Sequence, residues 1–312
     1  MSEKQLFDVA VVGYGPAGIT AAIYAARKKL SVILIGEEPG GEVINSGPIE
    51  NWPGDGQTDG IALAEKMKKH LQMYQDDVEI RQKKISKISK NQDGWFDLEI
   101  AEGEMVKAKT VIYTAGRHPR LLNVPGEKEF KNKGVTYCAT CDAPLFPEKD
   151  VVVIGGGNTG AEAIIMLQKI AKKIYLLHLG DSLPADPVLV NNFKNDPKVE
   201  IILKAKTKEI KGGAMVEQVV YENIESGEEK TLEAQGAFVH IGAIPNTEPV
   251  ADLIKLNEHK AIPADRYGVT EMPGFFAAGD VTDIRDAQIV VAAGQGCSAT
   301  LSAGDYLARL KV

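Results

Sequence analysis

The sequence predicts an α/β protein built from two Rossmann-like, dinucleotide-binding-type domains, with the second domain inserted in the first. Three observations lead to this fold class. At 312 residues the chain is long for a single hydrophobic core and suits two domains. A glycine-rich turn follows an apolar strand and opens a helix twice, at Gly13–Gly18 and at Gly155–Gly160. A short apolar strand and a small-residue helix, within Gly274–Leu310, then complete the first domain.

The first glycine turn has the setting that dinucleotide binding needs. The valine-rich run Phe7–Val12 predicts a strand, and an alanine-rich helix extends to Lys28. Gly13 permits the tight turn, Gly15 lets the backbone approach a pyrophosphate, and Gly18 lets the helix pack on the strand. The helix N-terminus attracts the phosphates. The alternative is an ordinary glycine turn without a ligand.

An acidic residue in the expected place favours the binding site over the ordinary turn. The second strand, Ser31–Ile35, ends just before Glu37, roughly twenty residues after the last glycine, where a carboxylate would hold a ribose hydroxyl. Two polar, turn-rich segments follow, Gly40–Glu42 and Ile49–Gly54. Composition alone leaves open whether they shape the site or only connect elements.

Two cysteines three positions apart, Cys138 and Cys141, indicate redox chemistry. They can close a small disulfide ring and pass two electrons to another disulfide, and Asp142 can exchange a proton with the leaving sulfur. The alternative is half of a zinc site. A structural zinc needs four ligands, however, and Cys297 has no histidine at ligand spacing, so we predict no metal and expect Cys297 to pack in the core. The polar segment Tyr137–Phe146 predicts a helix start or loop in which the thiols are accessible.

The second glycine turn, Gly155–Gly160, repeats the fold but lacks the usual signs of its ligand. After the next strand, Ile174–His178, an NADP site should offer arginines and an NAD site a carboxylate at the strand end. No arginine occurs between Arg120 and Arg266, and Asp181 lies three residues beyond the strand. This pattern favours a unit that keeps the fold without the nucleotide.

Composition limits the partners and the compartment. The formal net charge of −7 argues against nucleic acid as the main partner. No stretch approaches the apolar length of a membrane span, and the chain begins almost directly with a strand, so we expect no signal peptide and a cytoplasmic protein. In that reducing compartment a CxxC pair favours catalysis over a structural disulfide.

Apolar runs and turn residues predict the remaining elements. Further helices are expected at Gly60–Tyr74 and Gln288–Leu310, and after the second glycine turn to about Lys172. Further strands are expected at Val78–Ile88, Trp95–Ile100, Val106–Tyr113, Asp150–Ile154, Val199–Leu203, Val216–Tyr221, Ala237–Ile241 and Gly274–Asp280.

Five stretches, in order and spacing along the whole chain, resemble the low-molecular-weight thioredoxin reductases: Gly13–Gly18, Ile49–Gly54, Cys138–Asp142, Gly155–Gly160 and Phe276–Asp283. The resemblance implies a three-layer, glutathione-reductase-like homodimer. In it an FAD-binding domain, residues 1–117 and 246–312, is interrupted by a redox-disulfide domain, residues 118–245, with a degenerate NAD(P)-type fold.

The resemblance also implies roles for individual residues. Cys141 would be the sulfur next to the flavin, Cys138 the sulfur that attacks the disulfide of thioredoxin, and Asp142 the acid. The implied FAD-contacting residues are Gly13, Gly15, Pro16, Ala17, Gly18, Glu37, Gly41, Glu42, Asn51, Ala115, Gly116, Gly279, Asp280, Ala287, Gln288 and Ile289.

The chain departs from the NADPH-using members of that family. They carry a His-Arg-Arg stretch and a further arginine after the second domain's second strand, where this chain has His178-Leu179-Gly180 and Pro184. The arginine that usually precedes the position of Gln288 is Ala287. In this respect the chain is similar to the pyridine-nucleotide-independent, ferredoxin-linked flavin thioredoxin reductases. We therefore predict reduced ferredoxin as the electron donor, docked on the lysines at 66, 68, 69, 83, 84 and 87.

Three alternatives remain open. In the first, the thioredoxin reductase uses NADH or NADPH. In the second, the protein is a flavin reductase that acts on ferredoxin or another small acceptor, and the CxxC pair argues against this alternative. It would otherwise be a flavin-binding redox sensor whose disulfide switches a partner without turnover.

Overall fold

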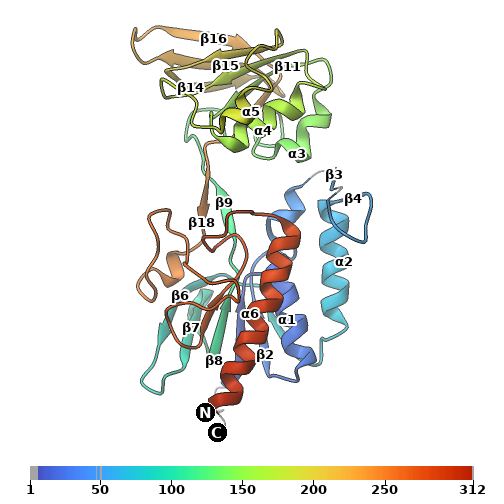
Figure 1. Ribbon diagram of the computed structural model, residues 1–312, viewed down its shortest axis with the longest axis vertical. Helices are drawn as coiled ribbons and strands as arrows, with labels where there is room; N and C mark the ends of the chain where they lie inside the picture. Colours follow the sequence, from blue (N-terminus) through green and yellow to red (C-terminus); the bar gives the residue numbers. More distant parts are fainter. Residues whose placement is uncertain (1–5, 47, 50, 311–312) are drawn as a thin grey trace. The chain divides into compact units, whose positions relative to one another are not determined.

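The computed structural model describes residues 6–310 except 47 and 50, and gives the backbone but not the side chains of 48, 140 and 141. The chain forms two compact units (Figure 1). The first unit contains Met1–Asn45, Ile49–His118 and Ile244–Val312, and the second contains Ser46–Pro48 and Pro119–Ala243.

A mixed sheet forms the centre of the first unit. Strands β5, β2, β1, β8 and β19 pair in parallel. Strand β8 also begins an antiparallel meander with β7 and β6. The order across the sheet is β5 (Val78–Arg81), β2 (Val32–Ile35), β1 (Leu6–Val12), β8 (Glu104–Tyr113), β7 (Phe96–Ile100) and β6 (Ile85–Lys90), with β19 at Phe275–Ala277.

Helices cover one face of this sheet. Helices α1 (Pro16–Arg27) and α6 (Ile289–Leu310) lie side by side there, with α2 (Gly60–Gln72) next to α1 (Figure 1). Small residues allow α1 and α6 to touch: a Cβ at Gly296 would lie 2.1 Å from the carbonyl oxygen of Ala17. The other face packs against the meander and the segment around Val250–Ile262. Apolar clusters on both faces of the sheet thus hold the carboxyl ends of β1, β2, β8 and β19 next to one another.

The second unit contains a fully parallel sheet and a small antiparallel one. Three helices lie on one side of the parallel sheet (Figure 1): α3 (Ala139–Asp142), α4 (Asn158–Leu167) and α5 (Pro187–Val190). Residues of α3 and α4 belong to one apolar cluster there. The parallel order is β10 (Val135–Thr136), β17 (Gly236–Val239), β11 (Asp150–Ile154), β12 (Lys173–Leu177) and β13 (Val199–Ile202), and the antiparallel strands are β14 (Ala205–Gly212), β15 (Val216–Asn223) and β16 (Glu229–Glu233).

The chain crosses between the units twice, and the two crossings pair with each other. They are β9 (Arg117–Pro119) and β18 (Ala243–Pro245). Asn246 secures the first-unit end, because its backbone carbonyl accepts a 2.7 Å hydrogen bond from the Tyr113 hydroxyl and its side chain lies 2.6 Å from Nδ1 of His118. A further short pair, β3 (Pro48–Ile49) and β4 (Thr58–Asp59), precedes α2.

Two sequence-based element predictions were wrong in extent. The expected strand Val78–Ile88 is two strands, β5 and β6, because the chain turns after Arg81, whose carbonyl accepts from the Lys83 amide at 2.9 Å. Helix α4 ends at Leu167 rather than near Lys172, and hydrogen-bonded turns follow it. Among the described residues, no helix is both long enough and apolar enough to cross a membrane.

Candidate functional site

The first glycine turn joins β1 to α1 and leaves an open space at the helix N-terminus. Gly13 has φ +114°, and a Cβ there would lie 2.2 Å from the Thr114 carbonyl oxygen. A Cβ at Gly18 would lie 1.9 Å from the Gly13 carbonyl oxygen. Both glycines are therefore required by the protein's own packing.

Gly15 differs from these two glycines. Its φ of −81° suits any residue, and the single atom within 4 Å of a Cβ there is the Gly40 carbonyl oxygen at 3.9 Å. No side chain caps α1, so its first amides point toward this space. A space left clear above free amides fits a pyrophosphate, so the residues present suit the dinucleotide cofactor.

Two further turns border the same helix N-terminus. The Gly40 amide donates to the Tyr14 carbonyl at 2.8 Å, and a Cβ at Gly41 would lie 3.1 Å from Cα of Gly15. On the other side Gly279 has φ +79°, and its missing Cβ would lie 3.2 Å from Cβ of Ala17. The structure thus brings the predicted residues of three separate stretches, including Pro16 at the start of α1, to one end of the sheet.

Asp280 follows β19 and is half-buried. Burial raises the pKa of its carboxyl, Arg117 opposes this, and Glu42 adds a smaller rise in the pKa. The Nε atom of Arg117 lies 3.5 Å from Oδ2 of Asp280. A carboxylate with one cationic neighbour still has acceptor capacity for ligand hydroxyls.

Other predicted contacts are brought together at this end of the first unit. The side-chain amide of Asn51 donates to Oε1 of Gln288 at 3.2 Å across a long sequence separation. The carbonyl oxygens of Ala115 and Gly116 accept from the side chain and backbone of Asn246, at 2.7 and 3.0 Å. Ile289 begins α6, and Ala287 precedes it by two residues.

Glu37, the predicted ribose acid, is exposed after β2. Within the described part of the chain its carboxylate makes no hydrogen bond or ion pair. An exposed acceptor without a protein partner is available to a ligand.

The second unit carries the redox segment. Cys138 is disulfide-bonded, and the Asp142 amide donates to its carbonyl oxygen at 3.1 Å, which forms the first turn of α3. The Thr136 hydroxyl donates to the Asp142 carboxylate, and the Cys138 amide donates to the same hydroxyl at 3.1 Å. Thr136 therefore links the Asp142 carboxylate to the backbone of Cys138. The side chain of Cys141 lies outside the described residues.

The third cysteine, Cys297, lies in the first unit and is not part of the redox segment. Cys297 is a free, half-buried thiol on α6. A hydrogen bond with this thiol raises the pKa of the Tyr24 hydroxyl on α1, so Cys297 contributes to the contact of the two helices.

The second glycine turn repeats the geometry of the first. Gly155 has φ +118° and its Cβ would lie 2.1 Å from the His240 carbonyl oxygen, whereas a Cβ at Gly157 would meet nothing within 4 Å. The residues after β12 are not suited to a 2′-phosphate. Leu179 is 56% exposed there, and Glu225, then Asp181, raise the pKa of Lys204, so this lysine already has acidic partners.

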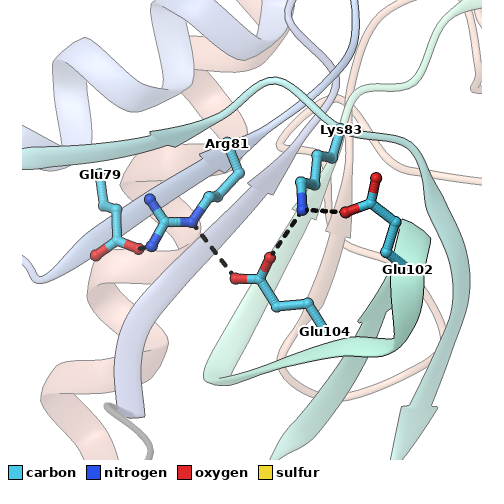
Figure 2. Close-up of polar contacts among 5 residues, drawn as sticks. All are labelled: Glu79, Arg81, Lys83, Glu102 and Glu104. Carbon is cyan, nitrogen blue, oxygen red and sulfur yellow. Dashed lines mark hydrogen bonds and ion pairs between the residues drawn. The ribbon is translucent and has the colours of Figure 1, made fainter.

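Most of the lysines proposed as a docking surface are paired with acids. Lys83 lies 3.0 Å from Glu102 and 3.5 Å from Glu104 (Figure 2). Figure 2 also shows Arg81 bonded to Glu79 and Glu104. These acids offset part of the charge that would attract an acidic partner. The other paired lysines are Lys66 with Asp55, Lys68 with Glu65 and Lys87 with Asp252.

Sequence reasoning missed three residues of these sites. Arg117 contacts Asp280, Oε1 of Gln295 accepts from the Gly279 amide at 2.8 Å, and His240 lies against the second glycine turn. The sequence marks Gln295 in one way, because it is an amide side chain in a helix of small residues. Arg117 and His240 had none, because their roles depend on strand register.

Comparison with known proteins agrees with this geometry. Residues 7–296 match the family described as pyridine nucleotide-disulphide oxidoreductase, and the chain belongs to that family. Among solved structures, the thioredoxin reductase from Streptococcus pyogenes MGAS5005 superimposes with a TM-score of 0.80 at 35% identity, over 98% of this chain and 100% of that one. The thioredoxin reductase of T. acidophilum gives 0.75 at 36% identity, over 98% and 100%.

Curated relatives are longer proteins. A protein named NADH dehydrogenase from Bacillus subtilis is 44% identical over 308 residues, which are 99% of this chain and 60% of the relative. The F component of alkyl hydroperoxide reductase in Escherichia coli is 41% identical over 314 residues, which are 100% and 60%. The chain thus spans about three-fifths of the length of these curated relatives.

These findings confirm the α/β fold with two dinucleotide-binding domains and the likeness to low-molecular-weight thioredoxin reductases. They also confirm FAD as the cofactor.

Proposed function

We propose that this chain is an FAD-dependent protein-disulfide oxidoreductase that reduces thioredoxin through Cys138 and Cys141. One observation carries the proposal: Cys138 is disulfide-bonded at the start of α3, in a chain whose first unit forms a dinucleotide site. FAD, when bound, supplies the electron pair that reduces the disulfide.

The proposed roles follow from the reaction. Cys141 is the sulfur that faces the flavin, and Cys138 leaves as a thiolate, attacks the thioredoxin disulfide and is released when Cys141 resolves the mixed disulfide. Asp142, held by Thr136, exchanges the proton with the leaving sulfur.

One dithiol must serve a buried cofactor and a large protein in turn, so we propose movement at Arg117–Arg120 and Gly242–Thr247. Cross-linking both segments should stop thioredoxin turnover and leave reduction of the flavin intact. Turnover at the full rate would contradict the movement.

We propose that the site in the first unit holds FAD by the stretches that converge there. The carboxylates of Glu37 and Asp280 bind hydroxyl groups of the cofactor, and the amides at the start of α1 bind its pyrophosphate. The further proposed contacts are Gly13, Gly15, Pro16, Ala17, Gly18, Gly41, Glu42, Asn51, Ala115, Gly116, Gly279, Ala287, Gln288 and Ile289.

For the electron donor we propose reduced ferredoxin rather than NADPH. Each charge-assisted contact to a phosphate contributes about 1.5–3 kcal/mol, so the three missing arginines should weaken NADPH binding by about a thousandfold or more. The lysine surface gives ferredoxin little support, since most of its charges are matched. The proposal therefore depends on the loss of the nucleotide contacts.

NADH is a second candidate donor, because two observations favour it. The space at Gly157 in the second glycine turn is open, and NADH lacks the 2′-phosphate. The Bacillus subtilis relative is named NADH dehydrogenase.

One anaerobic experiment separates the donors. The purified yellow protein is mixed in turn with reduced ferredoxin, NADH and NADPH, and the flavin absorbance is followed. Rapid bleaching by ferredoxin alone supports the first proposal, bleaching by NADH supports the second, and rapid bleaching by micromolar NADPH contradicts both. An insulin-reduction assay with thioredoxin then distinguishes a thioredoxin reductase from a flavin reductase or a redox sensor, since only the first gives thioredoxin-dependent turnover.

We further propose a homodimer in the cytoplasm. Light scattering of the FAD-loaded protein should give twice the 33.6 kDa chain mass. A monomer at micromolar concentration would contradict the assembly.

A further inference from the structure

His240 is a buried imidazole that the proposed reaction does not use. It directly follows β17 in the second unit and is 9% exposed. Its backbone is anchored, because its amide donates to the Ile154 carbonyl at 2.7 Å. Its Nε2 atom is fully buried and has no hydrogen-bond partner. A buried polar atom without a partner costs about 1–3 kcal/mol, which calls for an explanation.

The strand register puts His240 and the redox cysteine at the same end of the second unit's parallel sheet. Strands β10 and β17 are parallel neighbours, and Thr136 pairs with Phe238. Cys138 and His240 each follow their member of that pair by two residues, so both lie at the carboxyl ends of adjacent strands. Side chains two residues apart along a strand share a face. The side chain of His240 therefore lies on the face of Phe238, which packs with Ala139 of α3.

Two described polar groups near the redox segment already have partners. The Asp142 carboxylate accepts from Thr136, and the Tyr137 hydroxyl donates to Oε1 of Glu127 at 2.9 Å. Burial lowers the pKa of His240 to about 4, so the ring is neutral at pH 7 and one of its nitrogens carries a proton. In the oxidised protein its Nε2 atom has no hydrogen-bond partner.

We infer that the Nε2–H of His240 becomes the hydrogen-bond partner of the Cys138 sulfur when the disulfide is reduced. The disulfide takes up two electrons and one proton, the S–S bond breaks, one sulfur becomes a thiol and the Cys138 sulfur becomes a thiolate. The imidazole donates a hydrogen bond to that thiolate and keeps its proton. The unpaired atom in the oxidised state is thus satisfied in the reduced state, which favours reduction. This inference rests on the proposed redox role of the CxxC pair.

The test is a redox titration of the FAD-loaded protein against mixtures of reduced and oxidised dithiothreitol, read by counting free thiols. His240→Leu replaces the donor with an apolar side chain, and should lower the ratio of reduced to oxidised protein about tenfold at a fixed dithiothreitol mixture. For a two-electron couple this is about 30 mV. His240→Gln restores an N–H donor and should return the ratio to within about threefold of the wild type.

Thr207→Val is the matched control, because Thr207 is another buried residue of the second unit with an unpartnered side-chain oxygen, on β14. It should leave the titration unchanged. A His240→Leu protein that titrates like the wild type, or a Thr207→Val protein that shifts as much, would overturn the inference.

A measurement on the wild type covers the case in which the leucine variant fails to fold. With ¹⁵N-labelled histidine, one of the five histidines should change its Nε2 signal on reduction. Five unchanged signals would contradict the inference. Neither readout involves thioredoxin or an electron-donor protein. A negative insulin assay with a normal thiol titration would therefore count against the proposed function and leave the role of His240 intact.

Discussion

Gly15 and Gly18 give a direct test of the cofactor site, because the same substitution should have opposite effects at two positions of one turn. Alanine at Gly15 meets only one atom within 4 Å, at 3.9 Å, and φ −81° suits it. Replacing glycine there lowers the entropy of the unfolded chain, which stabilises the folded protein by about 0.4–1 kcal/mol. It also replaces a favoured N-cap residue, which destabilises the protein by a similar amount. The FAD-free protein should therefore keep its stability within about 1 kcal/mol.

Binding of FAD should respond in the opposite way. The methyl group of Gly15→Ala occupies the space in which the pyrophosphate approaches the α1 amides, so we expect the Kd for FAD to rise at least about tenfold, equivalent to about 1.4 kcal/mol. At Gly18 the new Cβ would lie 1.9 Å from a carbonyl oxygen, and the backbone must shift. Gly18→Ala should therefore destabilise the FAD-free protein by about 3 kcal/mol.

The assay combines thermal unfolding of FAD-stripped protein with titration of FAD by fluorescence. The reasoning is refuted if Gly15→Ala binds FAD as tightly as the wild type, or if it destabilises the FAD-free protein as much as Gly18→Ala does.

Four more predictions follow from the described contacts. Tyr113→Phe removes a buried 2.7 Å hydrogen bond and should cost about 1 kcal/mol in urea unfolding, whereas an unchanged midpoint would contradict the bond. Glu104→Gln should lower the Tm slightly at low salt and not in 1 M NaCl, because its ion pairs are largely exposed (Figure 2). Burial raises the pKa of Asp280, so its ionisation costs stability as the pH rises above the unfolded-state pKa of about 4. Asp280→Asn should thus raise the Tm of FAD-free protein at pH 7 and not at pH 3, and equal shifts at both would refute this assignment. Leu179→Arg combined with Gly180→Arg should tighten binding of NADPH more than of NADH, measured by protein fluorescence, and an equal gain for both would show that the 2′-phosphate is not bound there.

The parts of the fold that the sequence predicts are those with local causes. Both glycine turns are recognisable because a Cβ at Gly13 or Gly155 would collide with the residue that follows the neighbouring strand, Thr114 or His240. The same pattern does not separate β5 from β6, since the turn after Arg81 contains neither glycine nor proline. Apolar content signals a strand but not where it bends.

The site was predictable in proportion to how local its parts are. Glu37 and Gly41 follow the first turn closely, and a sequence pattern finds them. Asn51 and Gln288 are far apart in the chain, and only the family resemblance marks each of them as a cofactor contact; their hydrogen bond to each other is not predicted. His240 and Cys138 follow two strands that pair in one register, which no single-sequence pattern shows.

The paired crossings β9 and β18 make the second unit a detachable insert. The Arg120 amide donates to the Gly242 carbonyl at 2.9 Å, so the entry and exit of the insert are adjacent. A two-residue hairpin could join them and close the first unit into an uninterrupted flavin carrier without breaking any strand of its sheet. The first unit's sheet therefore does not depend on the second unit for its continuity.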